Sequence, residues 1–312
     1  MPPEIKVDRE RANAVFDELG PTPRLCIDYL RSAQINQYKW DTKTAISALT
    51  TSKLEQLFID TNSLTMDNTS HKIYLISRRD RENVSSLATV SPITSSIKLR
   101  LAIQFQTLEL HEQIRLYKYF SKVPGSSEMA GIFFEAAGQR CLQGGVELEF
   151  VPMVQLASSL TGKSQWNSSH VLFLNNAELE RSRQEALQQR QPLVIPKHLE
   201  YVKHEPSMPI KSNIIYVPEW TSQVALNSFI VMNNHLYIFQ FTIGGEHSIK
   251  PELMNFVCRY PELPSMDNWH LIFIIPPNHI LKCQQPRGRE MRELHPYSAV
   301  IDLDKWYKGM RH

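Results

Sequence analysis

The carboxylate of Glu135 lies inside an apolar helical run that begins at Ser126 and continues to Leu142. The run is apolar on most of its circumference and is expected to be buried, because it contains Met129, Ile132, Phe133, Phe134, Ala136, Ala137 and Cys141. A buried carboxylate is costly unless it is paired or ligates a metal ion. Alternatively, Glu135 belongs to a polar stripe with Glu128 and Gln139 that meets water. Spacing alone leaves both interpretations open.

Two amide side chains are the second candidate group for chemistry. The apolar runs Leu226–Met232 and His235–Ile243 flank the dipeptide Asn233-Asn234. Asparagine tolerates positive φ, so this pattern predicts a β-hairpin with a two-residue turn. With that turn, Asn227 lies opposite Gln240, and directly opposed side chains project to one face of a sheet. Two polar groups therefore meet at the end of an otherwise apolar hairpin.

The segments after the hairpin are expected to complete a sheet. Gly244-Gly245 breaks the second strand, and Ser248 is placed to cap a helix that packs back on the sheet. The continuous apolar run Trp269–Ile275 predicts a central strand beside the hairpin, buried on both faces. Ala299–Leu303 predicts a last short strand.

Between the apolar helix and the hairpin the pattern is weaker. We expect a strand over Val146–Leu156 and a shorter strand over Val171–Leu174. Ala177–Gln191 is rich in Glu, Arg and Gln, which predicts a solvated connecting helix. Pro192–Pro218 carries five prolines and predicts an extended crossing.

Residues 1 to about 124 are predicted to be mostly helical. Helices are expected over Asp8–Leu19, Leu25–Tyr38, Thr42–Leu57 and Ile97–Phe120, with a short strand over His71–Ser77. After this region, strands mixed with helices and one fully apolar strand fit a three-layer α/β domain. We therefore expect two domains, residues 1–125 and residues 126–312.

Charge and cysteine content exclude few functions. The chain of 312 residues carries 34 basic and 32 acidic residues, so no global positive field argues for nucleic acid, although a local basic cleft stays compatible with this balance. Four scattered cysteines without a C-x-x-C pair fit reduced thiols rather than zinc ligands or a disulfide framework. The charged N-terminus lacks the apolar core of a signal peptide, and no apolar run approaches a membrane span. These features indicate an intracellular protein outside membranes.

Partial motifs for nucleotide and zinc chemistry fail on spacing. T-G-K-S at 161–164 would be a P-loop only with a glycine in place of Ala157 and a helix after it, and a loop and strand are expected there instead. Lys163 is therefore expected in a solvated loop, and we predict no ATP site. His111-Glu112 lacks the second histidine that a zinc-binding helix requires, and no G-x-S-x-G occurs.

Several segments, in order along the chain, resemble the C-terminal domain of fungal Crinkler-type proteins, also called retrotransposon-hot-spot proteins. The segments are GIFFEAAGQRCL, YVPEW, LNSFI, YIFQFT, EHSIK and WHLIFIIPP, within residues 126 to 312. The resemblance implies a PD-(D/E)XK restriction-endonuclease-like fold, in which one strand carries an acidic residue and the next carries E-x-K. GPTPRLCIDYL (Gly20–Leu30) resembles the lid of the NTPase module that precedes this nuclease domain; Arg24 lies in it, but no P-loop accompanies it here.

The resemblance assigns catalytic positions, and this chain fills them with weaker groups. Glu135, Asn227 and Gln240 would hold Mg²⁺, a cation that prefers oxygen ligands. Asn227 removes the anionic ligand, whereas the carbonyl oxygen of Gln240 is able to ligate. Thr242 leaves the catalytic lysine position empty, and Lys250 at the start of the next helix either extends its amine into the site or is a solvated loop residue.

The function that follows from the resemblance is engagement of nucleic acid, with DNA favoured over RNA, by a nuclease-like domain of weak or absent activity. An active form would be a Mg²⁺-dependent endonuclease. The alternative is a protein-interaction module that keeps the nuclease fold as a scaffold, because a fold by itself does not determine a function. The resemblance also implies a separate NTPase or a host protein as partner, in an intracellular and nuclear location, and leaves open secretion as an effector.

Overall fold

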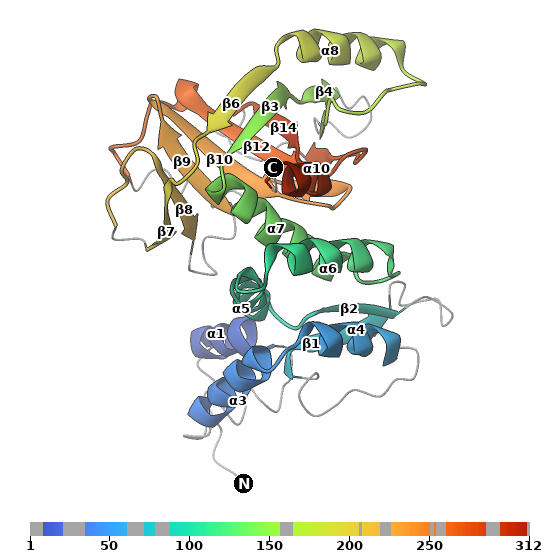
Figure 1. Ribbon diagram of the computed structural model, residues 1–312, viewed down its shortest axis with the longest axis vertical. Helices are drawn as coiled ribbons and strands as arrows, with labels where there is room; N and C mark the ends of the chain where they lie inside the picture. The colour runs from blue at the N-terminus through green and yellow to red at the C-terminus, as the bar shows by residue number, and fades with distance from the viewer. Residues whose placement is uncertain are drawn as a thin grey trace. The chain divides into compact units, whose positions relative to one another are not determined.

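A computed structural model describes residues 9–20, 35–60, 72–78, 88–156, 165–205, 208–218, 226–249, 253, 260–284 and 294–310. The chain divides into two compact units, Met1–Ala136 and Ala137–His312, and the division falls inside helix α7 (Ser127–Gln143). The first unit is mainly helical, and the second is built on a large mixed β-sheet (Figure 1). The expected mixed α/β class with a helical N-terminal region is therefore confirmed.

The described helices of the first unit follow the apolar periodicity of the sequence. They are α1 (Arg9–Leu19), α3 (Ile35–Ser47), α4 (Thr51–Asp60), α5 (Ser95–Gln106), α6 (Leu110–Lys122) and the first part of α7. Strands β1 (Tyr74–Arg78) and β2 (Ala88–Pro92) pair in antiparallel fashion. None of the helices in the described part of the chain is long and apolar enough to cross a membrane.

Two of the predicted helices are each interrupted. The run Ile97–Phe120 is split because the amides of Thr107 and Leu108 turn back to carbonyl groups of α5 and end that helix. The run Thr42–Leu57 is split between α3 and α4, and the Thr50 hydroxyl accepts a hydrogen bond from the Lys53 amide at the start of α4. The expected helix Leu25–Tyr38 is described only from residue 35 onward.

Stacked aromatic rings hold the helices of the first unit together. The ring of Phe133 on α7 lies 4.5 Å from that of Phe105 on α5 and 5.6 Å from that of Phe120 on α6. All three rings are fully buried. Each of these side chains removes a large apolar surface from water, so α5, α6 and the start of α7 share one aromatic core.

Eight strands form the large sheet of the second unit, in the order β6-β3-β14-β12-β10-β9-β8-β7. Their bounds are β3 (Val146–Pro152), β6 (Gln191–Ile195), β7 (Glu200–His204), β8 (Ile214–Pro218), β9 (Ser228–Met232), β10 (His235–Phe241), β12 (Trp269–Ile275) and β14 (Pro296–Val300). The pairs β10–β12, β12–β14 and β7–β8 are parallel, and the other neighbours are antiparallel.

The hairpin and the central strand form as predicted. Asn233 and Asn234 have φ values of 53° and 61°, the left-handed conformation that a two-residue hairpin turn requires. Met232 pairs with His235, and the same register extends to Ser228 and Phe239. β12 coincides with the run predicted from the sequence, lies between β10 and β14, and has six buried residues among its seven.

The two edge strands of this sheet are neighbours in sequence. β6 ends at Ile195 and β7 begins at Glu200, although they lie at opposite ends of the strand order. Five residue steps span at most about 18 Å, so the sheet has to curl to bring its edges that close. Gly145, with φ of +81°, makes room for the connection, because a Cβ atom there would lie 2.6 Å from Cγ of Lys197.

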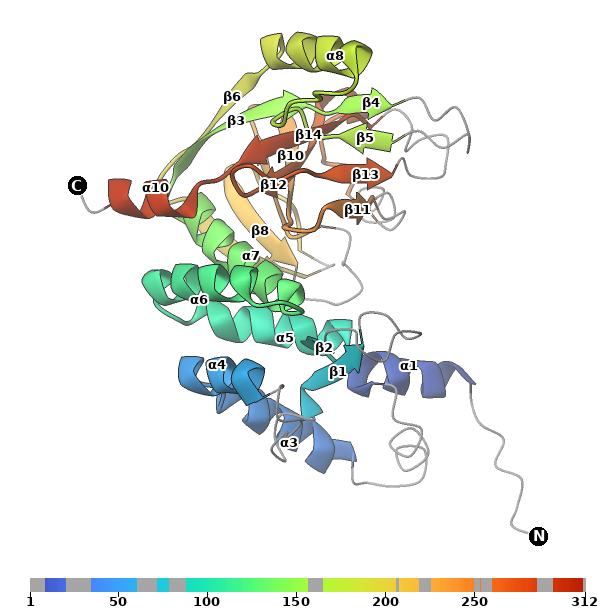
Figure 2. The same ribbon diagram turned by 90° about the vertical axis from the view of Figure 1, so that its right-hand side faces the viewer.

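A second, smaller sheet packs on one face of the large one. Its order is β11-β13-β5-β4, with bounds Glu246–Ser248, Lys282–Gln284, Gln165–Asn167 and Val154–Leu156 (Figure 2). Trp166 of β5 and Cys283 of β13 belong to the same buried cluster as Ile238 of β10 and Phe273 of β12. The main core of the second unit therefore lies between the two sheets.

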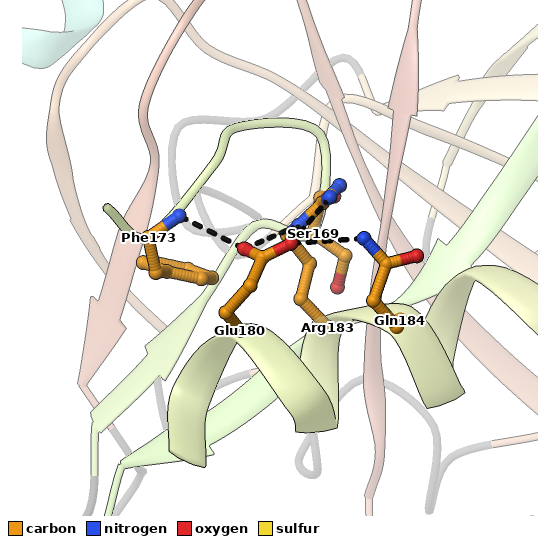
Figure 3. A network of polar contacts seen from close by, with 5 residues as sticks. All are labelled: Ser169, Phe173, Glu180, Arg183 and Gln184. Atoms are coloured by element: carbon orange, nitrogen blue, oxygen red, sulfur yellow. Dashed lines mark hydrogen bonds and ion pairs between the residues drawn. The ribbon is translucent and has the colours of Figure 1, made fainter. Parts of the chain in front are cut away.

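Helix α8 (Ala177–Gln188) is anchored to the domain, so the prediction of a purely solvated connector is wrong. Its residues Leu179 and Ala186 are buried with Val151 and Val154. Arg183 donates to both carboxylate oxygens of Glu180 at 2.7–2.9 Å, and Glu180 accepts the Phe173 amide at 3.0 Å (Figure 3). Arg183 holds the pKa of Glu180 at about 2, far below its usual value.

Other expected segments are shifted by local bonding. Val171–Leu174 is not a strand. The strand of this region is β5, and the segment after it is held against α8 by the hydrogen bond from the Phe173 amide to Glu180. The last strand, β14, ends at Val300, because Asp302 accepts the amides of Asp304 and Lys305 and caps α10 (Leu303–Gly309).

Two further predictions are corrected in the same way. Ser248 ends strand β11 instead of capping a helix, and β11 pairs with β13 in parallel. The crossing Pro192–Pro218 contains most of β6 and the strands β7 and β8; Pro192 lies on the edge strand β6, where a missing amide proton is tolerated, and Pro218 is the last residue of β8. The predicted strand Val146–Leu156 is present as β3 and β4, with a break at Met153.

We expect Phe273→Ala to lower the free energy of unfolding by about 3–5 kcal/mol, because it opens a cavity in the middle of β12, where Phe273 is fully buried. Urea denaturation of the parent and the variant measures the difference. Val194→Ala, at a position that is 58% exposed on β6, is the matched control and should change stability by less than about 0.5 kcal/mol. A loss below about 1 kcal/mol for Phe273→Ala would contradict its placement in the core.

Candidate functional site

Asn227 lies one residue before β9, where the hairpin ladder ends. Its main-chain amide donates to the Phe239 carbonyl at 3.0 Å, and its side-chain Oδ1 accepts the Phe241 amide at 2.7 Å. In a continuous ladder a main-chain carbonyl oxygen would accept that proton. The predicted register therefore holds to Ser228, and beyond it the Asn227 side chain acts as a strand acceptor.

A second amide, Gln139, connects α7 to this position. Its Nε2 donates to the Asn227 carbonyl at 3.4 Å, and its Oε1 accepts the Tyr201 hydroxyl at 3.1 Å. Gln139 is buried, so it is not part of a water-facing stripe, whereas Glu128 is exposed. This network of Tyr201, Gln139 and Asn227 carries no formal charge. It stabilises the fold by giving buried polar groups their hydrogen-bond partners.

Gln240 and α7 lie on opposite faces of the large sheet. In the second unit α7 packs on Phe241, since a Cβ atom at Gly138 would lie 2.3 Å from Cε1 of that ring. Side chains alternate along a strand, so Gln240 points away from the Phe241 face and shares the face of Ile238, which belongs to the core between the sheets. Gln240 is only 4% exposed.

Thr242 closes the strand β10 instead of offering a reactive group. Its amide donates to the Ile274 carbonyl at 3.0 Å, and its hydroxyl oxygen accepts the Gly244 amide at 3.1 Å. This hydroxyl-to-amide bond is a short turn that redirects the chain toward β11. Thr242 is buried, so a lysine at this position would have to extend its amine past the packed strand end.

The remaining predicted site residues are not brought together with these. Glu135 is half-buried on α7 and belongs to the first unit, and Lys250 lies outside the described residues. The grouping of Glu135 with Asn227 and Gln240 stays a prediction. In the ranges that the structure describes, no three His, Cys, Asp or Glu side chains gather to hold a metal ion.

The partial motifs of the sequence do not form a second site. The T-G-K-S segment with Ala157 and Lys163 lies outside the described residues, as does Arg24, and the strand expected after the segment is β5. His111 lies on α6 with more than half of its side chain exposed. Its neighbour Glu112 forms an ion pair with Arg115.

Sequence reasoning missed a cluster of rings centred on His270 of β12. His270 Nε2 lies 3.0 Å from Nδ1 of His235, and Tyr237 stacks on the His270 ring with centroids 5.0 Å apart. The rings of Phe150 and Tyr297 each lie 5.4 Å from that of His270. The sequence does contain a signal for this cluster. His235 and Tyr237 stand at alternate positions of one strand, so their rings project to one face, and Trp269–Ile275, which contains His270, was predicted as the neighbouring strand.

Burial lowers the pKa of His270 to about 4, and the charge of His235 acts in the same direction. The Nδ1 atom of His270 is buried, and no group in the described part of the chain forms a hydrogen bond with it. His270 is therefore neutral at neutral pH. The hydrogen bond between His270 Nε2 and His235 Nδ1 needs one proton, carried by one of these two nitrogen atoms.

Comparison of the chain with models of protein families, with curated proteins and with solved structures finds no match.

We expect Asn227→Leu to lower the free energy of unfolding by about 1–3 kcal/mol, because the Phe241 amide loses its acceptor next to the buried strand end. Urea denaturation measures the loss, and hydrogen exchange at the Phe241 amide should accelerate. Asn227→Asp is the matched control, since a carboxylate oxygen also accepts this bond. Equal stability of Asn227→Leu and the parent would show that the bond does not hold the hairpin end.

We expect the stability of the second unit to fall as the pH drops from about 6.5 toward 4, by about 1–3 kcal/mol. The pKa of His270 is lowered in the folded state, so the unfolded chain takes up the proton first and is favoured by acid. His270→Phe keeps the ring contacts and should flatten this dependence in pH-series urea denaturation. His111→Asn, a change at an exposed histidine, should leave the dependence unchanged. A parent curve without the drop would contradict the shift.

Proposed function

We propose that the second unit is a nuclease-like domain of the Crinkler type that engages nucleic acid without cleaving it. The ordered segments after residue 126 support the family, and the hairpin β9–β10 supplies the strand, turn and strand in which such a nuclease carries its motif. β12 continues the sheet in parallel to β10. The proposal implies an intracellular, nuclear protein that works with a separate NTPase or a host protein.

A three-layer core centred on β9, β10 and β12 is part of this proposal. α7 covers the Phe241 face of these strands. On the opposite face, Leu253 and Tyr260 are buried in the cluster that contains Ile238 and Phe273. The small sheet enlarges that layer, which is an addition to the simple helix–sheet–helix arrangement.

The expected loss of cleavage is carried by one observation: the Asn227 oxygen accepts the Phe241 amide at 2.7 Å and replaces a strand carbonyl. A neutral oxygen engaged in this way is a poor substitute for the carboxylate that Mg²⁺ prefers. Gln240 adds a second neutral oxygen, and Thr242 supplies a hydroxyl where an amine would assist the reaction. The position therefore supports strand pairing better than metal binding.

We expect the double variant Asn227→Asp, Thr242→Lys to gain nicking of supercoiled plasmid DNA in the presence of Mg²⁺, with none in the parent. The first change restores an anionic oxygen at almost unchanged volume, and the second restores the amine. Mg²⁺ should also raise the unfolding temperature of the double variant, because an ion that binds only the folded state stabilises it by mass action. Glu135→Gln in the same background is the control and should abolish both gains.

Because Thr242 is buried, the single variant Asn227→Asp is measured beside the double variant to separate misfolding from missing chemistry. If both variants fold and neither responds to Mg²⁺ in stability or nicking, the nuclease-like interpretation is wrong. Engagement of nucleic acid is tested separately, by the dependence of DNA affinity on salt concentration in the parent. Phosphate contacts give a steep negative slope, and a protein-only module would show no binding.

A protein-interaction module is the second candidate, and two exposed leucines favour it. Leu172 and Leu174 are 59% and 86% exposed in the segment before α8. The bonds of Glu180 and Arg183 to Phe173 and Ser169 hold this segment in place (Figure 3). Exposed apolar side chains on a fixed segment are typical of contact surfaces. Under this alternative, DNA titration of the parent would show no salt-dependent binding.

A further inference from the structure

A groove of about 470 Å³ lies between α3 and α5 in the first unit. Its lining includes three cationic side chains and three large apolar ones: Lys39, Lys43, Arg100, Trp40, Ile46 and Ile103. The two helices contact each other. No site predicted from the sequence includes any of these residues, and all of them belong to the first unit.

Trp40 gives the groove an open aromatic surface. Its side chain is 60% exposed, which is unusual for the largest apolar side chain, whereas Ile46 on the same helix is buried. No ring in the described part of the chain packs on the indole of Trp40. A free indole face next to an apolar floor is suited to a planar ligand, because stacking removes apolar surface from water on both partners.

The charges around the indole are unbalanced. Glu18 of α1 binds Lys39 at 2.8 Å and Arg100 at 3.3 Å. Lys43 is exposed and forms no ion pair within the described ranges. The three cations Lys39, Lys43 and Arg100 are thus balanced by one carboxylate, that of Glu18. The groove therefore carries two positive charges in excess and attracts anions.

We propose that this groove binds single-stranded nucleic acid. One base stacks on Trp40, and the adjoining phosphates are held by Lys43 and by Lys39 and Arg100, the two cations that share Glu18. Aromatic platforms combined with a cationic groove are the general means by which proteins hold single strands. Bases in a duplex stack on each other and would not offer a face to Trp40. An acidic peptide would satisfy the lysines but would leave the indole without a planar partner. This inference concerns the first unit and stands apart from the chemistry proposed for the second.

The test titrates full-length protein with a fluorescent oligothymidylate of about 12 nucleotides at several salt concentrations, using anisotropy. Lys43→Ala should reduce the slope of log affinity against log salt by about 0.7, the value for one phosphate contact on a single strand. Trp40→Ala should weaken binding about fivefold to a hundredfold and leave the slope unchanged, because stacking is not ionic. Trp40→Phe should retain most of the affinity.

Lys53→Ala is the matched charge control, because Lys53 is an exposed lysine on α4 outside the groove. An equal loss of slope in Lys53→Ala and Lys43→Ala would overturn the proposal, as would unchanged affinity in Trp40→Ala. Competition by polyglutamate as strong as by unlabelled oligonucleotide would identify an acidic peptide as the ligand instead. Equal affinity for a duplex of the same length would likewise overturn the assignment to single strands.

The outcomes also separate this inference from the function proposed for the second unit. If the parent binds nucleic acid and neither groove variant changes the binding, the groove proposal fails and the engagement by the second unit stands. If the groove variants act as expected and the Asn227 and Thr242 variants do not respond to Mg²⁺, the groove proposal stands and the nuclease-like interpretation of the second unit fails. A parent that binds no nucleic acid contradicts both.

Discussion

The positive φ angles of Asn233 and Asn234 fix the register on which the second unit depends. A two-residue turn leaves no freedom in the pairing that follows, so Leu236 and Ile238 face the core between the sheets and Tyr237 and Phe239 face the other side. β12 then pairs in parallel with β10 and extends both faces. A slip of one residue would exchange the two faces along the whole hairpin, so every side chain would lie on the wrong side of the sheet for the core that it packs in.

The end of the hairpin shows how an amide changes the use of a position. Asn227 has one oxygen and one amino group where an aspartate has two equivalent anionic oxygens. The oxygen completes the strand pairing to Phe241, and the main-chain carbonyl of Asn227 binds Gln139, which in turn binds Tyr201. These bonds cost little to maintain because no charge has to be desolvated. The same position is well adapted to holding the sheet and poorly adapted to holding a divalent cation.

Two kinds of polar organisation thus occur in the chain. In the second unit, Gln139 bonds to the Asn227 carbonyl and to Tyr201, and the His235–His270 contact lies among rings that keep His270 uncharged. In the first unit, the groove between α3 and α5 gathers exposed cations around an exposed indole. Exposed cations attract phosphate at long range, whereas buried amides cannot. If nucleic acid is the ligand, initial attraction is therefore better supported by the groove than by the end of the hairpin.

The sequence by itself determined the elements whose cause is local. The asparagine dipeptide specified the turn, the uninterrupted apolar run Trp269–Ile275 specified β12, and the apolar helical run from Ser126 to Leu142 specified α7. Tertiary structure decided what alternation and spacing leave open. Whether α7 covers the face of Phe241 or that of Gln240 depends on the close approach permitted by Gly138, and no local pattern encodes that choice. The burial of α8 through Arg183 and Glu180, and the meeting of Lys39, Lys43 and Arg100 across two helices, likewise require contacts between distant segments. Charge and polarity in a sequence identify the groups, but only packing decides which of them share a surface.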